Sequence, residues 1–212
     1  MKTFLNFLFL VACNLAAHAQ PDYASFVDPF IGSGGHGHVF VGANVPFGFV
    51  QLGPQNIHKG WDWTSGYHYS DSIVIAFSHT HLSGTGCADL GDVGLMPYMG
   101  EKTPKVGAQD NITGSTSSYY KHDKEIVKPG YYAVKLENGV NVELTATERV
   151  GYHRYHFDGS QTPRILVDLV NANSGVVFDT QITQIDNTTI QGYRFSNGWA
   201  SPHKIFFYAK FN

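Results

Sequence analysis

The chain has 212 residues, of which 15% are charged and 14% aromatic, with a formal net charge of −3 and a pI of about 6.4. So few charges with so many aromatic rings favour packed strands over disorder. The net charge is slightly negative, and the sequence has no cluster of Lys and Arg of the kind that binds nucleic acid or an anionic membrane surface. We therefore expect one globular domain, with neutral molecules or other domains as its partners and no nucleic acid.

The first 19 residues predict a signal peptide. Lys2 precedes an apolar run over residues 4–17, and the small residues Ala17 and Ala19 precede Gln20. The run is too short for a membrane span. An alternative remains, because LVAC, ending at Cys13, has the form of a lipoprotein signal and would anchor the protein through that cysteine. Either interpretation predicts an exported protein, periplasmic or secreted, with the folded domain spanning 20–212.

Removal of Cys13 with the signal peptide leaves Cys87 as the remaining cysteine. A single cysteine forms no internal disulfide, so the core must be stable without one. We expect Cys87, between Gly86 and Ala88, to be a small packed residue rather than a nucleophile.

Strand patterns extend over most of the chain. Asn138-Gly139 predicts a hairpin turn, and Asp158-Gly159 and Asp186-Asn187 predict further turns. We predict an extended segment over 26–31 and a long surface connection over 101–128, extended around Tyr119 and Tyr120. The predicted strands cover 47–52, 73–77, 93–98, 131–136, 140–147, 150–157, 164–170, 176–185, 188–195 and 204–211. Many short strands separated by turns predict an all-β, antiparallel two-sheet sandwich.

Glycine and histidine concentrate between residues 28 and 99, where six of the chain's 11 histidines lie. Without helical periodicity, such a segment is typical of site-forming loops held between short strands. The glycine loop over 32–37 lacks the lysine and hydroxyl residue of a phosphate-binding loop.

This segment carries GSGGHGH (32–38), PFGFVQLGP (46–54), GWDW (60–63), FSHTHLSGTG (77–86) and ADLGD (88–92). Further motifs are KPGYYAV (128–134), ELTATERVGYHRY (143–155) and GWA (198–200). Together they resemble the N-terminal domain of glycoside hydrolase family 92, the calcium-dependent exo-α-mannosidases. The resemblance implies a large two-sheet sandwich followed by a helical catalytic barrel. We expect that catalytic domain to be missing here, either because the chain is a fragment or because the domain has lost its partner.

The resemblance also implies a substrate-binding role for Gly37, His38, Trp61 and Asp62, with His79 and His81 as further candidates. Residue chemistry agrees for Trp61 and Asp62, because an indole stacks on a sugar ring and a carboxylate bonds its hydroxyls. Trp63 is an alternative stacking residue. In the family, the catalytic acid, the base and the calcium ligands come mainly from the helical domain. We therefore assign no catalytic residue to this chain, although inversion requires two carboxyl groups; the available ones include Asp62, Asp71, Asp89, Asp92, Glu143 and Glu148.

His79 and His81 also allow a metal hypothesis, because residues two apart share one face of a strand. With Asp89 or Asp92 they would make a zinc site, whereas hydrogen-bonded histidines of a sandwich are the simpler explanation. The segment 152–156 is expected to form a cross-strand ladder with one wet face, or else a surface that docks the missing domain.

Three functions therefore remain open. The first is the N-terminal domain of an exported α-mannosidase, shaping the mannose pocket together with a catalytic domain and inactive alone. The second is a free-standing carbohydrate-binding module, and the third is a metal-binding sandwich enzyme. The sequence does not distinguish among the possible mannosidic linkages.

Overall fold

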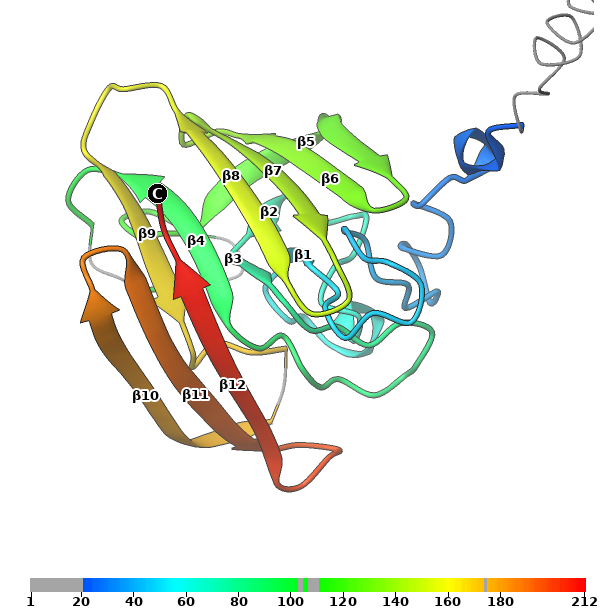
Figure 1. Ribbon diagram of the computed structural model, residues 1–212. Coiled ribbons are helices and arrows are strands. Elements are labelled where there is room, and N and C mark those ends of the chain that lie inside the picture. The colour runs from blue at the N-terminus through cyan, green and yellow to red at the C-terminus, as the bar shows by residue number, and fades with distance from the viewer. Residues whose placement is uncertain (1–20, 103–104, 107–110, 174) are drawn as a thin grey trace, which may run out of the picture.

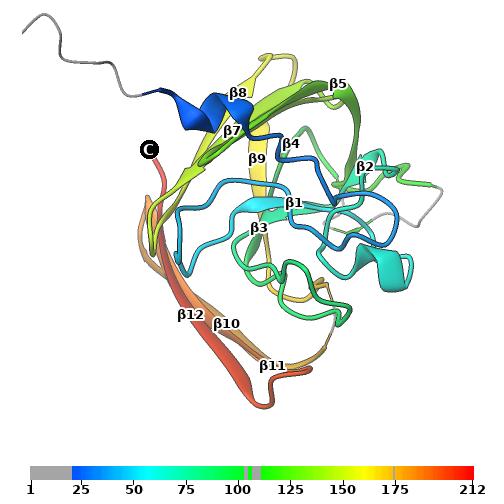
Figure 2. The same cartoon turned by 90° about the vertical axis from the view of Figure 1, so that its right-hand side faces the viewer.

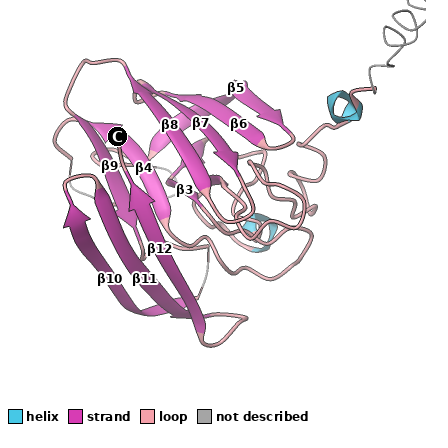
Figure 3. Ribbon diagram, viewed as in Figure 1, coloured by secondary structure: helices cyan, strands magenta, loops and turns pink. Residues whose placement is uncertain are grey.

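The computed structural model describes residues 21–102, 105–106, 111–173 and 175–212 (Figure 1). The predicted signal peptide and Cys13 lie outside these ranges. Within the described residues, two short 3-10 turns, η1 (Tyr23–Phe26) and η2 (Trp61–Trp63), are the helical elements, and strands make up the rest of the regular structure (Figure 3). No described helix has the length and apolar character needed to cross a membrane.

The strands form three antiparallel sheets, with orders β1-β3-β4-β9, β2-β5-β6-β7-β8 and β10-β11-β12. The bounds are β1 (Gly53–Gln55), β2 (Ile73–Val74), β3 (Ala76–Ser78), β4 (Gly94–Met99), β5 (Ser118–Lys128), β6 (Tyr131–Leu136), β7 (Val140–Ala146), β8 (Gly151–Phe157), β9 (Pro163–Asp168), β10 (Val176–Asp186), β11 (Thr189–Asn197) and β12 (His203–Lys210). In Figure 2, the five-stranded and three-stranded sheets follow one another along a curved outer wall, with β1, β3 and β4 on its inner side. The expected all-β antiparallel sandwich is confirmed, and its hydrogen bonding divides it into three sheets rather than two.

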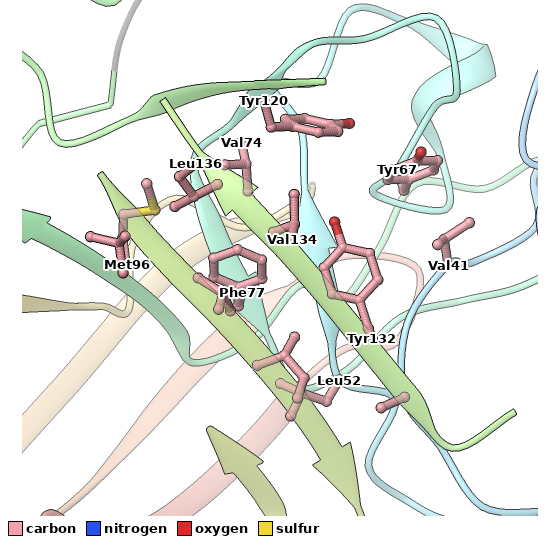
Figure 4. Packing of buried hydrophobic residues seen from close by; sticks show 14 of the residues in the cluster. Val41, Leu52, Tyr67, Val74, Phe77, Met96, Tyr120, Tyr132, Val134 and Leu136 are labelled. Atoms are coloured by element: carbon pink, nitrogen blue, oxygen red, sulfur yellow. The ribbon is translucent and has the colours of Figure 1, made fainter. Parts of the chain in front are cut away.

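The main core lies between the four-stranded and five-stranded sheets (Figure 4). In β7, alternate residues Val140, Val142 and Leu144 are fully buried, because successive side chains of a strand point to opposite faces. They meet Phe77 and Met96 from the facing sheet within one apolar cluster. Burying a side chain of this size contributes about 1.5–3 kcal/mol. The alternation visible in the sequence is therefore what assembles this part of the sandwich.

A smaller cluster attaches the three-stranded sheet. Ile205 of β12 packs against Val93 and Leu169, with Val167 and Phe207 at its margin. Beneath it, Asp92 bonds the Arg194 guanidinium, and both side chains are fully buried. The third sheet is thus joined to the sandwich by apolar packing and by a buried ion pair.

The predicted turns and the strands from residue 131 onward are found within a few residues of their expected bounds. Asn138 Oδ1 accepts a hydrogen bond from the Val140 N–H at 3.1 Å, and Gly139 has φ +89°. At the β10–β11 turn, Asp186 Oδ1 accepts from the Thr188 N–H at 2.7 Å. Asn and Asp favour turns through such side-chain bonds, so local chemistry sets these hairpins.

The segment 150–157 forms β8 with the expected wet face. On its outer side, Glu143 of β7 bonds Tyr131 Oη at 2.8 Å and lies 3.5 Å from Arg154 and 3.2 Å from His156. The opposite face carries His153 and Tyr155. The cross-strand ladder is therefore present.

The predicted strand over 47–52 is wrong. Phe47 has φ +60° and is fully exposed, since Pro46 and Gly48 flank a tight turn. The N–H groups of Phe49 and Val50 both donate to the Glu148 carbonyl, and Leu52 alone forms an isolated bridge, with Ala43. A loop attached to the β7–β8 turn therefore replaces the strand.

The predictions for the segments 26–31 and 101–128 also need correction. Residues 26–31 are not extended, because Asp28 Oδ1 accepts from the Phe30 N–H at 3.0 Å and the Ile31 N–H donates to the Asp28 carbonyl. In the segment 101–128, the extended part is longer than expected, since β5 runs for 11 residues. A register shift between Tyr120 and Glu125 interrupts its pairing with β6. The segments 73–77 and 93–98 do form buried strands, the first split between β2 and β3.

Candidate carbohydrate-binding site

A tight glycine loop forms one side of the candidate site. A Cβ atom on Gly37 would lie 2.1 Å from the Gly32 carbonyl oxygen, so no other residue fits there without moving the backbone. The same carbonyl accepts the Val39 N–H at 3.1 Å and closes the loop. The loop delivers His38 with φ +54°, an uncommon conformation that directs its buried imidazole inward.

Trp61 opens η2 and presents an exposed indole. Gly60 precedes it with φ +122°, and the side chain of Trp61 is 58% exposed. Its Nε1–H donates to the Gly86 carbonyl at 3.0 Å. The His38 ring lies perpendicular to the indole, with 4.2 Å between ring centroids. A hydrogen bond and a ring contact therefore hold the indole in position while it remains accessible from solvent.

Asp62 lies next to this tryptophan. His36 Nδ1 is 2.5 Å from its Oδ1, and His38 Nε2 is 3.8 Å from the same oxygen. The hydrogen bond from His36 lowers the pKa of Asp62, so the carboxylate is ionised at neutral pH. Its side chain is 29% exposed, which leaves oxygen surface free to accept further hydrogen bonds.

The Nε2 atom of His38 is buried and has no hydrogen-bond partner among the described residues. Buried polar atoms in native proteins are nearly always paired, so an unpaired one beside an exposed indole calls for an explanation. The Asp62 carboxylate, with Oδ1 3.8 Å away, is beyond hydrogen-bond distance of this atom.

Trp63 is held differently from Trp61. Its Nε1–H donates to Asp71 Oδ2 at 2.9 Å, and its ring stacks on His68 with centroids 4.4 Å apart. Lys59 Nζ lies 2.9 Å from the same carboxylate. These contacts give Trp63 a packing role within this part of the domain.

His79 and His81 lie between the layers of the sandwich, each with its own partners. The buried His81 donates from Nδ1 to the Gln51 carbonyl at 2.8 Å, accepts from Ser78 Oγ at 3.1 Å, and stacks on Phe40. Burial lowers its pKa to about 4. The structure therefore brings Gly37, His38, Trp61 and Asp62 together, and places His81 in the packed interior.

The partners of His79 fix its tautomer. Nδ1 donates to the Val93 carbonyl at 2.6 Å, so Nε2 accepts a hydrogen bond from the Nε2–H of His153 at 3.0 Å. His153 Nδ1 in turn accepts from the Tyr155 hydroxyl at 2.7 Å. Burial lowers the pKa of both histidines. This chain of neutral groups leaves no lone pair of His79 for a metal.

The proposed zinc ligands do not converge. Across residues 21–102, 105–106, 111–173 and 175–212, no group of three or more His, Cys, Asp or Glu side chains is placed to hold a metal. Asp92 is bonded to Arg194, and Asp89 accepts from the Leu90 and Ala200 N–H groups. Among the described residues, His79, His81, Asp89 and Asp92 therefore do not fit a zinc site. Cys87 is exposed rather than packed, contrary to expectation, because it lies on the loop surface beyond Gly86.

Fold and site define an antiparallel β-sandwich domain that presents a fixed, exposed tryptophan beside an ionised carboxylate. Residues 26–212 match the model of the glycosyl hydrolase family 92 N-terminal domain. The chain belongs to this family, as its N-terminal domain.

Solved and curated relatives agree. The family GH92 α-mannosidase BT3965 from Bacteroides thetaiotaomicron is 36% identical with a TM-score of 0.85, and the match covers 88% of this chain and 25% of that one. The GH92 family glycosyl hydrolase ccman5 is 27% identical with a TM-score of 0.70, covering 88% and 26%. An uncharacterized secreted glycosidase of Arthroderma benhamiae is 31% identical over 176 residues, 76% of this chain and 22% of the relative. The chain thus spans about a quarter of the length of these relatives.

Proposed function

We propose that this domain binds a terminal α-mannoside of a glycan and forms part of the mannose pocket of an exported α-mannosidase. The remainder of that pocket belongs to a catalytic domain outside this chain. The observation that carries the proposal is the exposed Trp61 indole, which is held by His38 and lies beside the ionised Asp62 carboxylate.

The chemistry of these three side chains suits a neutral sugar. An indole face stacks on the apolar face of a pyranose ring, whose C–H groups carry partial positive charge. An ionised carboxylate accepts hydrogen bonds from hydroxyl groups, and such charge-assisted bonds are the stronger kind. The His38 ring, perpendicular to the indole with 4.2 Å between ring centroids, helps to hold Trp61 in position. Gly37 permits the loop geometry that delivers this histidine.

Hydrolysis is assigned to the complete enzyme, because the family resemblance implies that the catalytic acid and base lie mainly in a helical domain outside this chain, and several carboxylates of this domain bond its own side chains. Glu143 bonds Tyr131 and neighbours Arg154 and His156, and Asp71 bonds Lys59 and Trp63. We assign the calcium requirement to the complete enzyme too, with ligands outside this chain. The domain alone is therefore expected to bind mannosides without cleaving them.

The proposal includes export to the periplasm or the medium. It is supported by the predicted signal peptide and by a relative that is named as secreted. Anchoring through a lipidated Cys13 is the alternative. N-terminal sequencing of the mature protein distinguishes these, since cleavage after Ala19 leaves Gln20 first and lipidation leaves a modified Cys13.

The native gene product, purified from its source cells with an antibody to this domain, tests the function. We expect an intact mass several-fold above the 23.4 kDa of this chain, release of mannose from α-mannosides, and loss of that activity with EDTA. A longer product that releases no mannose would contradict the proposal. A processed product slightly below 23.4 kDa that binds mannosides would favour the free-standing carbohydrate-binding module.

A further inference from the structure

A hydrogen bond between the buried residues Asn173 and Thr64 connects the end of η2 to the segment that follows β9. Asn173, 4% exposed, follows β9 and donates from Nδ2 to the Thr64 carbonyl at 2.5 Å and to the Asp89 carbonyl at 3.4 Å. Thr64 directly follows η2, the turn that begins with Trp61. Its Oγ1 also donates to the Thr85 carbonyl at 3.1 Å. The position of Trp61 is therefore fixed to the segment 85–89 from several sides.

Asp89 fixes a second loop to the same segment. It is 3% exposed, and its Oδ2 accepts from the Ala200 N–H at 3.2 Å, in the connection between β11 and β12. A Cβ atom on Gly198 would lie 2.5 Å from Asp89 Oδ1, so glycine is required for this close approach. Between these two contacts stands Trp199, whose side chain is 71% exposed.

Trp61 and the loop that carries Trp199 are consequently both bonded to the segment 85–89. Trp61 donates to the Gly86 carbonyl, and Gly86 precedes Asp89 by three residues, a span of at most about 10 Å. Figure 2 shows the green loop after β3 between the cyan η2 and the turn that joins β11 to β12. Trp199 lies in the GWA motif but is not among the site residues predicted from the sequence.

An exposed tryptophan on a turn is common and needs no function by itself. Here, however, the turn is constrained by a glycine that admits no side chain and by a buried carboxylate with a backbone partner. These constraints determine where the indole lies while leaving it open to solvent. Exposed aromatic side chains held rigidly are the usual anchors of binding surfaces.

We propose that Trp199 is a second aromatic platform for the ligand of the Trp61 site, so that the surface accepts an α-mannose oligosaccharide rather than a single sugar. Asp89 is its positioning residue. This inference rests on the proposed function. One sugar unit stacks on Trp61 beside Asp62, and a later unit of the same chain reaches Trp199 across the segment 85–89. Within that segment, Gly86 and Cys87 are exposed to solvent.

Calorimetric titrations of this chain with methyl α-mannoside, an α-mannobiose and an α-mannotriose test the inference. We expect affinity to rise with chain length by about fivefold or more, as one additional aromatic contact predicts. Trp199→Ala should abolish this rise and leave the affinity for methyl α-mannoside unchanged, while Trp199→Phe should keep part of it. Phe206→Ala, at a residue 69% exposed on β12, is the matched control and should change neither quantity.

Asp89→Asn tests the positioning role, because it weakens the acceptor of the Ala200 N–H. We expect a reduced gain with chain length, together with faster hydrogen exchange of the Ala200 amide. Binding of methyl α-mannoside without any gain from longer chains, in wild type and in Trp199→Ala alike, would overturn the inference and leave the proposed function intact. Failure of every mannoside to bind would overturn both.

Discussion

His36 Nδ1 lies 2.5 Å from Oδ1 of Asp62, at the exposed edge of the site and 26 positions apart in the sequence. The contact joins the glycine loop to η2, the two elements that carry the candidate sugar-binding side chains. It keeps Asp62 ionised, and so gives the site one fixed negative charge next to the Trp61 indole.

Asp62→Asn should weaken the binding of methyl α-mannoside by about tenfold or more, because a charged acceptor contributes about 1.5–3 kcal/mol and the amide replaces it with a neutral one. Calorimetry measures this change. Asp123→Asn is the control, since that carboxylate is 67% exposed and neighbours Lys124 on β5. Equal affinities for wild type and Asp62→Asn would remove Asp62 from the site.

The buried histidines predict a loss of stability in acid. Burial lowers the pKa of His81 to about 4, and it also lowers those of His79 and His153. In the unfolded chain these imidazoles titrate near the ordinary value of about 6.5. Between about pH 6.5 and 4, the unfolded chain therefore binds more protons than the folded one, so the free energy of unfolding is highest above pH 6.5 and falls as the pH decreases.

For His81 alone, the loss across that window is at most about 3 kcal/mol. Urea unfolding at several pH values across that window measures the trend. The glutamine of His81→Gln does not titrate in this pH range. The free energy of unfolding of this variant should therefore fall less between neutral and acid pH than that of wild type. The same difference in the variant as in wild type would mean that His81 is not the buried neutral group inferred here.

Removal of Asp92 should strongly destabilise the domain. Its carboxylate is fully buried and bonds Arg194, whose side chain is 2% exposed, and it also accepts from Thr80 Oγ1 at 2.6 Å. Asp92→Ala leaves a buried guanidinium without a counter-charge, which costs about 3–5 kcal/mol. Urea unfolding measures the loss.

Two variants make this interpretation specific. Glu137→Ala, at a side chain 51% exposed, should change stability by less than about 0.5 kcal/mol. The double variant Asp92→Ala/Arg194→Met should recover part of the loss, because no uncompensated charge remains. A double variant less stable than Asp92→Ala would show that the charge is not the cause.

Phe47→Gly should stabilise the domain, although it deletes an aromatic ring. The ring is fully exposed, and φ +60° is strained for any residue with a Cβ atom, by about 1–2 kcal/mol. Part of that gain is offset by the greater chain entropy of glycine, so we expect a net gain of about 1 kcal/mol in the free energy of unfolding. A loss of stability would mean that the Phe47 ring makes a contact that stabilises the loop.

The second half of the sandwich was predictable because its determinants are local. Period-two alternation in β7, together with Asn138-Gly139 and Asp186-Asn187, fixes strands and turns without reference to the rest of the chain. The failure at Phe47 has the opposite cause. Its neighbours resemble a buried strand, but the Glu148 carbonyl binds their N–H groups from far along the sequence.

The candidate site was predictable in part. Motif resemblance named Gly37, His38, Trp61 and Asp62, and the structure brings these four together. It also named His79 and His81, whose roles stay a prediction. Both imidazoles are bonded within the domain, His79 to the Val93 carbonyl and His81 to the Gln51 carbonyl. The role proposed for Trp199 required the fold, because a buried carboxylate 110 positions earlier holds its loop.

The indole N–H resonances of the three tryptophans, followed by NMR while methyl α-mannoside is added, test the central claim most directly. Variants with phenylalanine at each position assign the resonances. The account predicts a saturable shift of the Trp61 resonance, while that of Trp63, bonded to Asp71, stays in place. A Trp61 resonance that does not move at saturating sugar, or one whose titration midpoint is unchanged in Asp62→Asn, would contradict it.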